Sequence, residues 1–377
     1  MPQREVWGWI VTHRGDTAMI TLFGATGYTG QLVAQALERR GVPYRLAGRS
    51  ADKLASLAAT LASHPGWVVA DVARSETLTC LCRGTRVVIN CVGPFTDWGE
   101  VIVKQALLAG VRYVDITNEL GYVYRLRAYD KLARATGAIV APACGFEVAL
   151  ADCAADVLAG LVGVSEAVPA DSIDVVYDLA GSGSSLGTRR SAVRALATSW
   201  LGYRQQRWVG EAPGSRLRRF YLPRGACWAL AFPSSEIVTI PAHIPTRQVT
   251  AWLITGRLAP LWAPMLVPLF ARLAQGMVGR LSVALALLVG PPPAGLRRQA
   301  PFTIQVELCH AGRLDKLILT GQGVYDLTAE LAAYLAEQML FLGKEYVGVL
   351  PPARIVPPQT LLTEVGRWGV HCHREVE

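Results

Sequence analysis

Three glycines near the start of the chain have the spacing of a loop that binds nucleotide phosphates. The sequence GATGYTG places Gly24, Gly27 and Gly30 between a β-branched run and a helical pattern. In such a loop the first glycine allows a tight turn, the second lets the backbone approach a pyrophosphate, and the third lets the helix pack on the strand. The first N–H groups of the helix then bind phosphate, because they have no acceptor within the helix. The residues expected to bind a dinucleotide here are Gly24, Ala25, Thr26, Gly27, Tyr28, Thr29 and Gly30.

The residues after the second predicted strand favour NADP(H) over NAD(H). NAD-binding proteins place an acid there, about 20 residues after the glycines, to meet the ribose 2′-hydroxyl. This chain has Arg49 and Ser50 instead, with Lys53 one helical turn later. An arginine can bind a 2′-phosphate through two hydrogen bonds, whereas a carboxylate would repel it. Arg49, Ser50 and Lys53 are therefore expected to bind the 2′-phosphate end of NADP(H).

Two later strand ends are expected along the path of the dinucleotide. The run WVVAD ends at Asp71, whose carboxylate, or the following amide of Val72, can meet the adenine amino group. A helix N-cap is an equally good interpretation of Asp71. The next strand ends in a Gly-Pro turn that lets the backbone approach a ribose and the nicotinamide, and packing is the alternative for its cysteine. The residues expected at this turn are Cys91, Val92, Gly93 and Pro94.

These loops require a sheet that brings their strand ends together. From Met19, the predicted strands are MITLF, YRLAG, WVVAD, RVVINC, YVDI and AIVAP, with helical patterns at 28–40, 51–63, 101–109 and 122–136. Such alternation gives parallel βαβ units in a sheet that is covered on both faces. The expected fold class is α/β, with a Rossmann-type doubly wound parallel sheet and a ligand crevice at the carboxyl ends of its strands.

After about residue 160 the predicted strands become longer, which indicates a second domain. SIDVVYDL, RQVTAWLIT, FTIQVELC and LDKLILTGQG are typical of an α+β domain with a mixed or antiparallel sheet. We place the NADP-binding domain at 19–160 and a substrate or dimerisation domain, compatible with a homodimer, at 161–344. Residues 1–18 are expected to be a poorly ordered extension, with translation starting at either Met1 or Met19.

The composition describes a folded chain with an unusually apolar segment. The 377 residues are 51% hydrophobic and 18% charged, with a mean hydropathy of +0.29, which excludes intrinsic disorder. Arg272 and Arg280 divide the apolar insertion 258–290 into pieces shorter than the roughly 18 residues of a membrane span. The insertion is therefore expected to contact a lipid-like substrate or a membrane surface. Eight cysteines without a CxxC pair predict no metal site and a cytoplasmic protein. A position peripheral to the membrane is the alternative that the apolar insertion leaves open.

A basic stretch lies between residues 187 and 227, which contains nine arginines and only one acidic residue, Glu211. Two interpretations stay open: a solvated basic face, or a surface for an anionic carrier, an acidic lipid or a carboxylate substrate. No recognisable nucleic-acid module accompanies the stretch, so nucleic acid is not an expected partner. The arginines are Arg189, Arg190, Arg194, Arg204, Arg207, Arg216, Arg218, Arg219 and Arg224.

The motifs together resemble the saccharopine dehydrogenase-like family of NADP-dependent oxidoreductases. The resemblance rests on GATGYTG, AGRS, NCVGPF, YVDITNE and PACGFEVALAD in the first half, and on GSGSSLGTRRSAV, GQGVYDLTA and GVLPPARIVPPQTLL later. Within the family the chain looks most similar to the trans-acting enoyl reductases of long-chain lipid and polyketide assembly. The resemblance implies an NADPH-dependent enzyme that acts on a hydrophobic enoyl substrate, free or bound to a carrier. It also implies that residues 345–377 pack back on the first domain.

Two other functions stay open. One is an amino-acid or imine dehydrogenase of the lysine-pathway type, and the other is a non-catalytic protein that binds NADP and attaches to lipid surfaces. Hydride transfer needs a proton donor, yet no Ser-x-x-x-Tyr-x-x-x-Lys relay is present. The catalytic residue is therefore left unassigned, with Tyr113, Asp115, Glu119 and Tyr325 as candidates.

Overall fold

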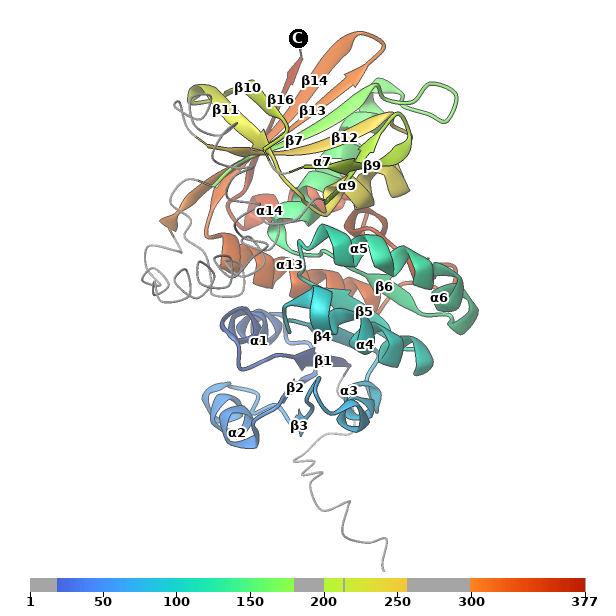
Figure 1. Ribbon diagram of the computed structural model, residues 1–377. Coiled ribbons are helices and arrows are strands. Elements are labelled where there is room, and N and C mark those ends of the chain that lie inside the picture. Colours follow the sequence, from blue (N-terminus) through green and yellow to red (C-terminus); the bar gives the residue numbers. More distant parts are fainter. Residues whose placement is uncertain (1–18, 180–199, 213, 256–298, 377) are drawn as a thin grey trace, which may run out of the picture. The chain divides into compact units, whose positions relative to one another are not determined.

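The computed structural model describes residues 19–179, 200–212, 214–255 and 299–376 (Figure 1). The predicted extension 1–18 and the apolar insertion 258–290 lie outside the described residues. The chain divides into two compact units. The first comprises residues up to Thr117 together with Arg125–Gly145 and Tyr325–Leu350, and the second comprises Asn118–Tyr124, Phe146–Val324 and Pro351–Glu377.

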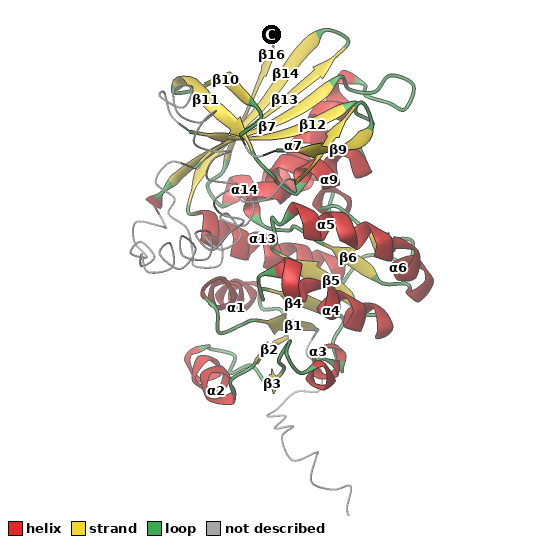
Figure 2. Ribbon diagram, viewed as in Figure 1, coloured by secondary structure: helices red, strands yellow, loops and turns green. Residues whose placement is uncertain are grey.

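The first unit is built on a parallel sheet of seven strands in the order β15-β6-β5-β4-β1-β2-β3 (Figure 2). The strands are β1 (Ile20–Phe23), β2 (Tyr44–Gly48), β3 (Trp67–Val69), β4 (Val87–Asn90), β5 (Arg112–Asp115), β6 (Ile139–Ala141) and β15 (Gly348–Val349). β1 pairs with β2 on one side and with β4 on the other, so the strand order reverses there. This is the switch point at which doubly wound sheets bind ligands. The predicted Rossmann-type fold class is confirmed.

Helices separate these strands. They are α1 (Tyr28–Arg40), α2 (Ala51–Thr60), α3 (Thr79–Cys82), α4 (Phe95–Leu108), α5 (Leu120–Leu126), α6 (Asp130–Thr136) and α13 (Val324–Met339). The unit boundary crosses α5. α13 lies beside α1, where Arg39 pairs with Glu330 at 2.5 Å and Arg40 pairs with Glu337 at 2.8 Å. The prediction placed α13 in the second domain, but these ion pairs hold it in the first unit.

The second unit is built on a mixed sheet of nine strands. Seven of them follow the order β10-β11-β12-β7-β13-β14-β16, and β8 joins β12 and β9 beside this path. β12 and β7 are parallel, and the other pairs are antiparallel. The strands are β7 (Ser172–Asp178), β8 (Trp200–Arg204), β9 (Arg207–Glu211), β10 (Leu217–Leu222), β11 (Gly225–Ala231), β12 (Gln248–Ile254), β13 (Pro301–His310), β14 (Arg313–Gln322) and β16 (His371–Val376).

One face of this sheet packs on α7 (Phe146–Val162), which contacts β13 and β14. The Phe146 and Phe302 rings lie 5.4 Å apart, and Ile304 and Val306 on the same face of β13 are fully buried. α7 is buried on most of its surface, as expected of a helix that is apolar all round. It therefore belongs to the second unit from Phe146 onward, whereas the prediction extended the first domain to residue 160. The other helices here are α9 (Glu236–Thr239) and α14 (Pro358–Arg367).

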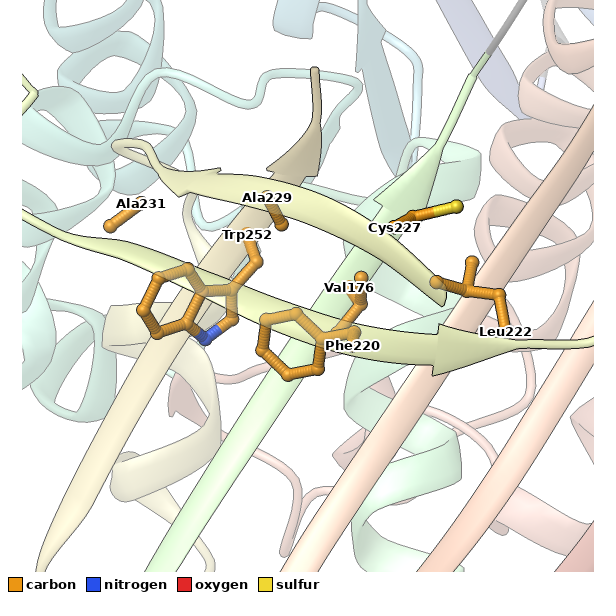
Figure 3. Packing of buried hydrophobic residues seen from close by; sticks show 7 residues of the cluster. All are labelled: Val176, Phe220, Leu222, Cys227, Ala229, Ala231 and Trp252. Carbon is orange, nitrogen blue, oxygen red and sulfur yellow. The ribbon is translucent and has the colours of Figure 1, made fainter. Parts of the chain in front are cut away.

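The opposite face carries a second apolar cluster, which Figure 3 shows. Phe220 of β10 lies with its ring centroid 5.3 Å from that of Trp252 on β12, and both side chains are almost fully buried. The hydrogen bond from Gln305 Nε2 on β13 to the Tyr221 carbonyl oxygen is 3.1 Å. Because β10 and β13 are not neighbours in the sheet, these contacts show that the β10–β11 hairpin folds over this face. The cluster comprises Val176, Phe220, Leu222, Cys227, Ala229, Ala231 and Trp252.

The C-terminal segment is shared between the two sheets. β15 pairs with β6 in the first unit, whereas β16 pairs with β14 along six residues in the second. The resemblance implied that all of residues 345–377 pack on the first domain. The structure differs from residue 351 onward, because β16 pairs with β14 at the edge of the second sheet.

Candidate functional site

The glycine turn after β1 has the geometry that its sequence predicted. Gly24 has φ +82°, and a side chain there would meet the Val92 Cγ2 atom at 2.9 Å. A Cβ on Gly30 would lie 2.1 Å from the Gly24 carbonyl oxygen, and one on Gly27 would lie 3.2 Å from the same oxygen. Glycine at 24 and 30 is therefore what allows α1 to begin directly on the turn. The turn leaves room for a backbone approach to phosphate.

Helix α1 presents a suitable end to an anion. Gly27 is its N-cap and provides no side-chain cap, and the first turn contains no acidic residue. The first bond to the cap within the helix runs from Gln31 N–H to the Gly27 carbonyl oxygen at 2.9 Å. The preceding N–H groups therefore have no acceptor within the helix, and the positive end of the helix dipole adds to their attraction for phosphate.

Tyr325, a predicted proton-donor candidate, lies at the same helix end. Its ring meets the Tyr28 ring edge-on, with the centroids 5.2 Å apart and the planes at 81°. Tyr325 is the second residue of α13, whose ion pairs with α1 fix its position. Within the first unit, Tyr325 is therefore next to the first residue of the phosphate-binding helix.

The end of β2 offers two positive charges. Ser50 is the N-cap of α2, and its Oγ accepts a hydrogen bond from the Lys53 N–H at 3.4 Å. Arg49 and Lys53 are both exposed, and neither pairs with a carboxylate among the residues that the structure describes. The Ser50 hydroxyl thus positions the helix, while the two cations stand at the carboxyl end of β2, where a 2′-phosphate is expected.

Asp71 follows β3 and holds a tight turn. Its Oδ1 atom accepts a hydrogen bond from the Ala73 N–H at 3.0 Å, and its N–H donates to Thr77 Oγ1 at 2.9 Å. Oδ2 lies 4.0 Å from Arg74 Nε. These contacts stabilise a turn, but the N-cap of the short 3-10 helix that follows is Arg74, so the helix-cap interpretation of Asp71 was wrong. The role of its carboxylate and of Val72 toward adenine stays a proposal.

A buried polar network joins the ends of β4, β5 and β6. Asn90 Nδ2 donates to the Tyr113 hydroxyl oxygen at 2.9 Å, and that hydroxyl donates to Asp115 Oδ2 at 3.0 Å. Asn90 Oδ1 accepts from the Val92 N–H at 2.9 Å, so it fixes the loop after β4. Asp115 Oδ1 accepts from the N–H groups of Thr117 and Ala143 at 3.1 and 2.9 Å.

This network orients two loops of the sheet edge. Asn90, Tyr113 and Asp115 are all fully buried, and their hydrogen-bonding groups are directed at one another and at the loop backbone. Ala143 has φ +60°, a conformation that costs a non-glycine residue energy, and Asp115 holds its N–H. We infer that Tyr113 and Asp115 position the loops rather than donate the catalytic proton.

Two cysteines, Cys91 and Cys144, lie in loops at this edge of the sheet. Burial raises the pKa of Cys91 to about 12, and the Asp115 carboxylate adds to the shift, so the thiolate is scarce at neutral pH. The buried Cys144 thiol faces the carbonyl oxygens of Ala141 and Pro142 at 3.5 and 3.8 Å. The Cys144 side chain is fully buried in the first unit.

The second unit contains a group of buried polar side chains that sequence reasoning missed. Glu147 Oε2 accepts a hydrogen bond from Asn118 Nδ2 at 2.6 Å, and Asn118 Oδ1 accepts from the Ser235 N–H at 2.8 Å. The Ser234 hydroxyl lies 2.9 Å from Asn118 Oδ1 and 2.7 Å from Glu236 Oε2. Tyr177 donates its hydroxyl hydrogen to Glu236 Oε1 at 2.8 Å. We call Asn118, Glu147, Tyr177, Ser234 and Glu236 the carboxylate cluster.

Both carboxyl groups of this cluster hold protons more tightly than usual. Burial raises the pKa of Glu236 to about 7, against the opposing effect of its hydrogen bonds, and the charge of Glu147 adds to the rise. Burial also raises the pKa of Glu147, which the hydrogen bond from Asn118 opposes. Asn118 and Glu147 lie inside the quoted motifs YVDITNE and PACGFEVALAD, so an acid within the second motif was the available signal.

Glu119, the remaining proton-donor candidate, belongs to the second unit at the start of α5. Its carbonyl oxygen accepts hydrogen bonds from the N–H groups of Tyr122 and Val123 at 3.0 and 3.2 Å. Its side chain is half-buried.

A buried histidine lies elsewhere in the second unit. His243 is held between Asp152 at 3.0 Å and Asp156 at 3.1 Å, and its side chain is 3% exposed. Burial alone would lower its pKa, but the two carboxylates raise it to about 9, so the imidazolium form is held at neutral pH. Arg354 and His243 line a cavity of about 410 Å³. The Arg354 side chain also donates to the His243 carbonyl oxygen.

Four arginines of the basic stretch pair with acids of the second unit. Arg218 lies 2.7 Å from Asp174 and 3.4 Å from Glu307, both almost fully buried. Arg204 and Arg216 both form ion pairs with Glu211, and Arg224 is 2.5 Å from Asp178. Arg207 and Arg219 are exposed, whereas Arg189, Arg190 and Arg194 lie outside the described residues. Much of the described basic stretch therefore serves the sheet itself.

Comparison with known proteins agrees with the geometry of the first unit. Residues 20–141 match the family model of the saccharopine dehydrogenase NADP binding domain. These residues form a saccharopine dehydrogenase-type NADP-binding domain. The match covers all the predicted cofactor-binding residues and confirms NADP(H) as the cofactor of this domain, while the role of each residue stays a proposal.

Curated relatives match a stretch of about a third of the chain. The trans-acting enoyl reductase of Mycobacterium leprae (strain TN) is 37% identical over 134 residues, which are 34% of this chain and 32% of that protein. The lipid droplet localized protein of Caenorhabditis elegans is 33% identical over 145 residues, 35% of this chain and 34% of that protein. The chain thus spans about a third of the length of these relatives. The resemblance to the trans-acting enoyl reductases is confirmed over about a third of the chain.

The fold of the whole chain is that of a solved saccharopine dehydrogenase. The apo structure of the L-Glu-forming enzyme from Saccharomyces cerevisiae matches with a TM-score of 0.63 and 14% identity. The match covers 95% of this chain and 99% of that one, so it includes both units. In the part of the chain that the structure describes, no helix is long and apolar enough to cross a membrane.

Proposed function

We propose that the protein is an NADPH-dependent oxidoreductase that reduces a hydrophobic acyl substrate with a C=C bond next to its carbonyl. The choice of NADPH as the cofactor rests on the end of β2, where the Arg49 and Lys53 side chains are exposed beside the glycine turn. A 2′-phosphate needs positive charge there, and the chain has no acid at these positions. The enoyl reductase relatives support the acyl half.

The residues of the NADP-binding domain fit the cofactor. The glycine turn and the start of α1 would hold the pyrophosphate, and Arg49 and Lys53 would hold the 2′-phosphate. The loop Cys91–Pro94, fixed by Asn90 at Val92, would lie along the ribose and nicotinamide. When bound, NADPH supplies a hydride to the substrate. The protein's own residues orient the partners, exclude water and supply a proton.

Titration calorimetry with NADPH and NADH tests the cofactor assignment. Arg49→Ala should weaken NADPH binding about 10- to 100-fold, since a charged hydrogen bond is worth about 1.5–3 kcal/mol. NADH affinity should stay unchanged, and Arg83→Ala, another exposed arginine of the first unit, should leave both unchanged. Equal affinity of the wild type for the two cofactors, or an unchanged ratio in Arg49→Ala, would contradict the proposal.

Turnover tests the substrate class. We expect NADPH oxidation with a medium-chain trans-2-enoyl thioester and none with 2-oxoglutarate plus an amine. Oxidation only with the second pair would identify an amine-forming dehydrogenase instead. Liposome binding without any NADPH oxidation would identify a non-catalytic protein at a lipid surface.

We further propose that the acyl chain arrives on an anionic carrier or at a lipid surface. The lipid droplet relative supports a lipid setting, and Arg207 and Arg219 are exposed cations of the second unit. Binding of an acylated carrier protein should then weaken as salt is raised, because exposed charges are screened. Binding that does not respond to salt would contradict this part of the proposal.

A further inference from the structure

From Tyr325 onward, helix α13 belongs to the first unit, although it lies outside the residues 20–141 that the family model matches. Its contacts with α1 show in which direction the two helices run. Tyr28 and Tyr325 meet where both helices begin, whereas Arg40 and Glu337 pair near the point where both helices end. The helices are therefore parallel, and their N-termini lie side by side at the glycine turn.

Two arginines fix the other end of α13 to the sheet. Arg112, the first residue of β5, donates to the Leu342 carbonyl oxygen at 2.7 Å. Arg86, just before β4, donates to the Leu340 carbonyl oxygen at 2.9 Å. Both arginines stand at the amino ends of their strands. The helix thus crosses the sheet from the amino edge to the carboxyl edge, and its first turn is held at the edge where doubly wound sheets bind ligands.

The start of α13 also meets the loops that follow β5 and β6. A Cβ on Gly145 would lie 3.2 Å from the Ile116 carbonyl oxygen and 3.8 Å from Thr328 Cγ2. Thr328 is buried at this contact. In the strand order β6-β5-β4-β1, the first turns of α13 therefore reach from the loops after β6 and β5 to the glycine turn after β1. The path expected for the dinucleotide runs along the same edge.

The two neighbouring helix ends differ in charge. The first turn of α1 contains no acidic residue, whereas α13 has Asp326 in its first turn. A carboxylate there interacts favourably with the N-terminus of its own helix, which makes that end less attractive to a second anion. Phosphate is therefore expected at α1, and α13 can offer a side chain instead. The Tyr325 side chain is half-buried against α1, and its hydroxyl is a hydrogen-bond donor.

We propose that Tyr325 is a cofactor-binding residue whose hydroxyl donates a hydrogen bond to the pyrophosphate of NADP(H). The inference rests on the proposed binding of NADPH and not on the identity of the substrate. It moves Tyr325 from the candidates for the proton donor to the cofactor site, and it makes the start of α13 part of that site. The sequence did not indicate this role, because α13 is distant from the glycine turn along the chain.

Titration calorimetry of Tyr325→Phe tests the hydroxyl while it keeps the ring contact with Tyr28. NADPH and NADH should each bind roughly 10- to 100-fold more weakly, the usual loss for a hydrogen bond to a charged group. The ratio of the two affinities should stay as in the wild type, in contrast to Arg49→Ala. Adenosine 2′-monophosphate, which has no pyrophosphate, should bind as it does to the wild type. Tyr346→Phe, at an exposed tyrosine of the first unit, is the control and should leave all three affinities unchanged.

Hydrogen–deuterium exchange of the wild type tests the contact with α13 without any substitution. NADPH should slow amide exchange both at the glycine turn and at the start of α13, because a ligand that contacts both segments stabilises both against local opening. Slower exchange at the glycine turn alone would overturn the proposed contact.

Failure of the tyrosine assignment and failure of the proposed function give different results. A wild type that binds neither NADPH nor NADH overturns the cofactor part of the proposed function, and Tyr325 loses its role with it. A wild type that binds NADPH, together with Tyr325→Phe of unchanged affinity, overturns the tyrosine assignment and leaves the cofactor site intact. Weaker binding of adenosine 2′-monophosphate by Tyr325→Phe would mean that the whole domain is disturbed, which also overturns the assignment.

Discussion

The cofactor site of the first unit and the polar clusters of the second unit are built in different ways. In the first unit the backbone makes the site: glycines shape the turn, N–H groups begin α1, and the cations at Arg49 and Lys53 stand exposed. In the second unit side chains make the clusters, and Glu236 and His243 are buried among partners from distant segments. A site made by backbone needs a short contiguous motif, whereas a site made by side chains needs the completed fold.

The largest expected effect follows from the backbone site. Gly30→Ala should destabilise the first unit by about 3 kcal/mol or more, because a clash with backbone cannot be relieved by a side-chain rotation. The new Cβ would lie 2.1 Å from the Gly24 carbonyl oxygen. NADPH binding should be lost together with stability, as the turn and the start of α1 must separate. Thermal unfolding and calorimetry measure the two losses.

Gly160→Ala in α7 is the matched control, since nothing lies within 4 Å of the Cβ it would add. It should leave NADPH binding unchanged and stabilise the protein by up to about 1 kcal/mol, because alanine favours a helix. A Gly30→Ala protein as stable as the wild type would show that the turn is not fixed by backbone contact. The contrast between the two units would then disappear.

This contrast explains how much the sequence predicted. Six of the seven strands of the first sheet and the glycine turn follow from local patterns, so their positions were predicted closely, whereas the two-residue strand β15 was not predicted. The boundary at Phe146 was missed because an apolar helix such as α7 does not indicate which sheet covers it. Glu147 was missed as a site residue because Asn118 and Glu236, which give it its environment, are distant in the sequence. The family model covers the region where local motifs are dense.

His243 gives a pH-dependent test of the side-chain cluster at Asp152 and Asp156. Its folded pKa of about 9 lies above the usual 6.5, so the folded state binds the proton more tightly. The stabilisation is then complete below about pH 6.5 and is lost as the pH rises to 9, a change of about 3 kcal/mol. Urea unfolding of the second unit at several pH values between 7 and 9 measures the slope.

His243→Gln should remove that slope, because no proton is then released in this range at this site. Glu236 has its pKa raised from 4.5 to about 7, so the change in stability linked to its proton falls mostly between these two values and contributes little above pH 7. His371→Gln, on the exposed strand β16, is the control and should keep the slope. A slope that survives in His243→Gln would mean that another group releases the proton. The contacts of His243 with Asp152 and Asp156 would then not account for the pH dependence of stability.

The basic stretch shows the same contrast in its charges. Counted along the sequence, its arginines exceed acids by eight, which suggested an anionic partner. The fold brings Asp174, Asp178 and Glu307 to them from β7 and β13, so several of the cations are partnered within the sheet. Charge along a sequence therefore predicts a surface only where no buried acid from another strand reaches it.

Arg218 tests this conclusion with the smallest expected effect. Arg218→Ala leaves Asp174 and Glu307 buried without their nearest cation, which should cost about 2 kcal/mol after allowance for the half-exposed guanidinium. Burial already raises the pKa of Glu307, and the charge of Arg218 opposes that rise. Removing Arg218 should therefore raise the pKa of Glu307 further. The loss of stability caused by Arg218→Ala should therefore be largest at pH values above that raised pKa. It should become smaller toward acid pH, as Glu307 takes up a proton. Arg219→Ala, the exposed neighbour on β10, should change stability by less than about 0.5 kcal/mol at any pH. Equal effects of the two substitutions would return the whole stretch to the role of a solvated or partner-binding face.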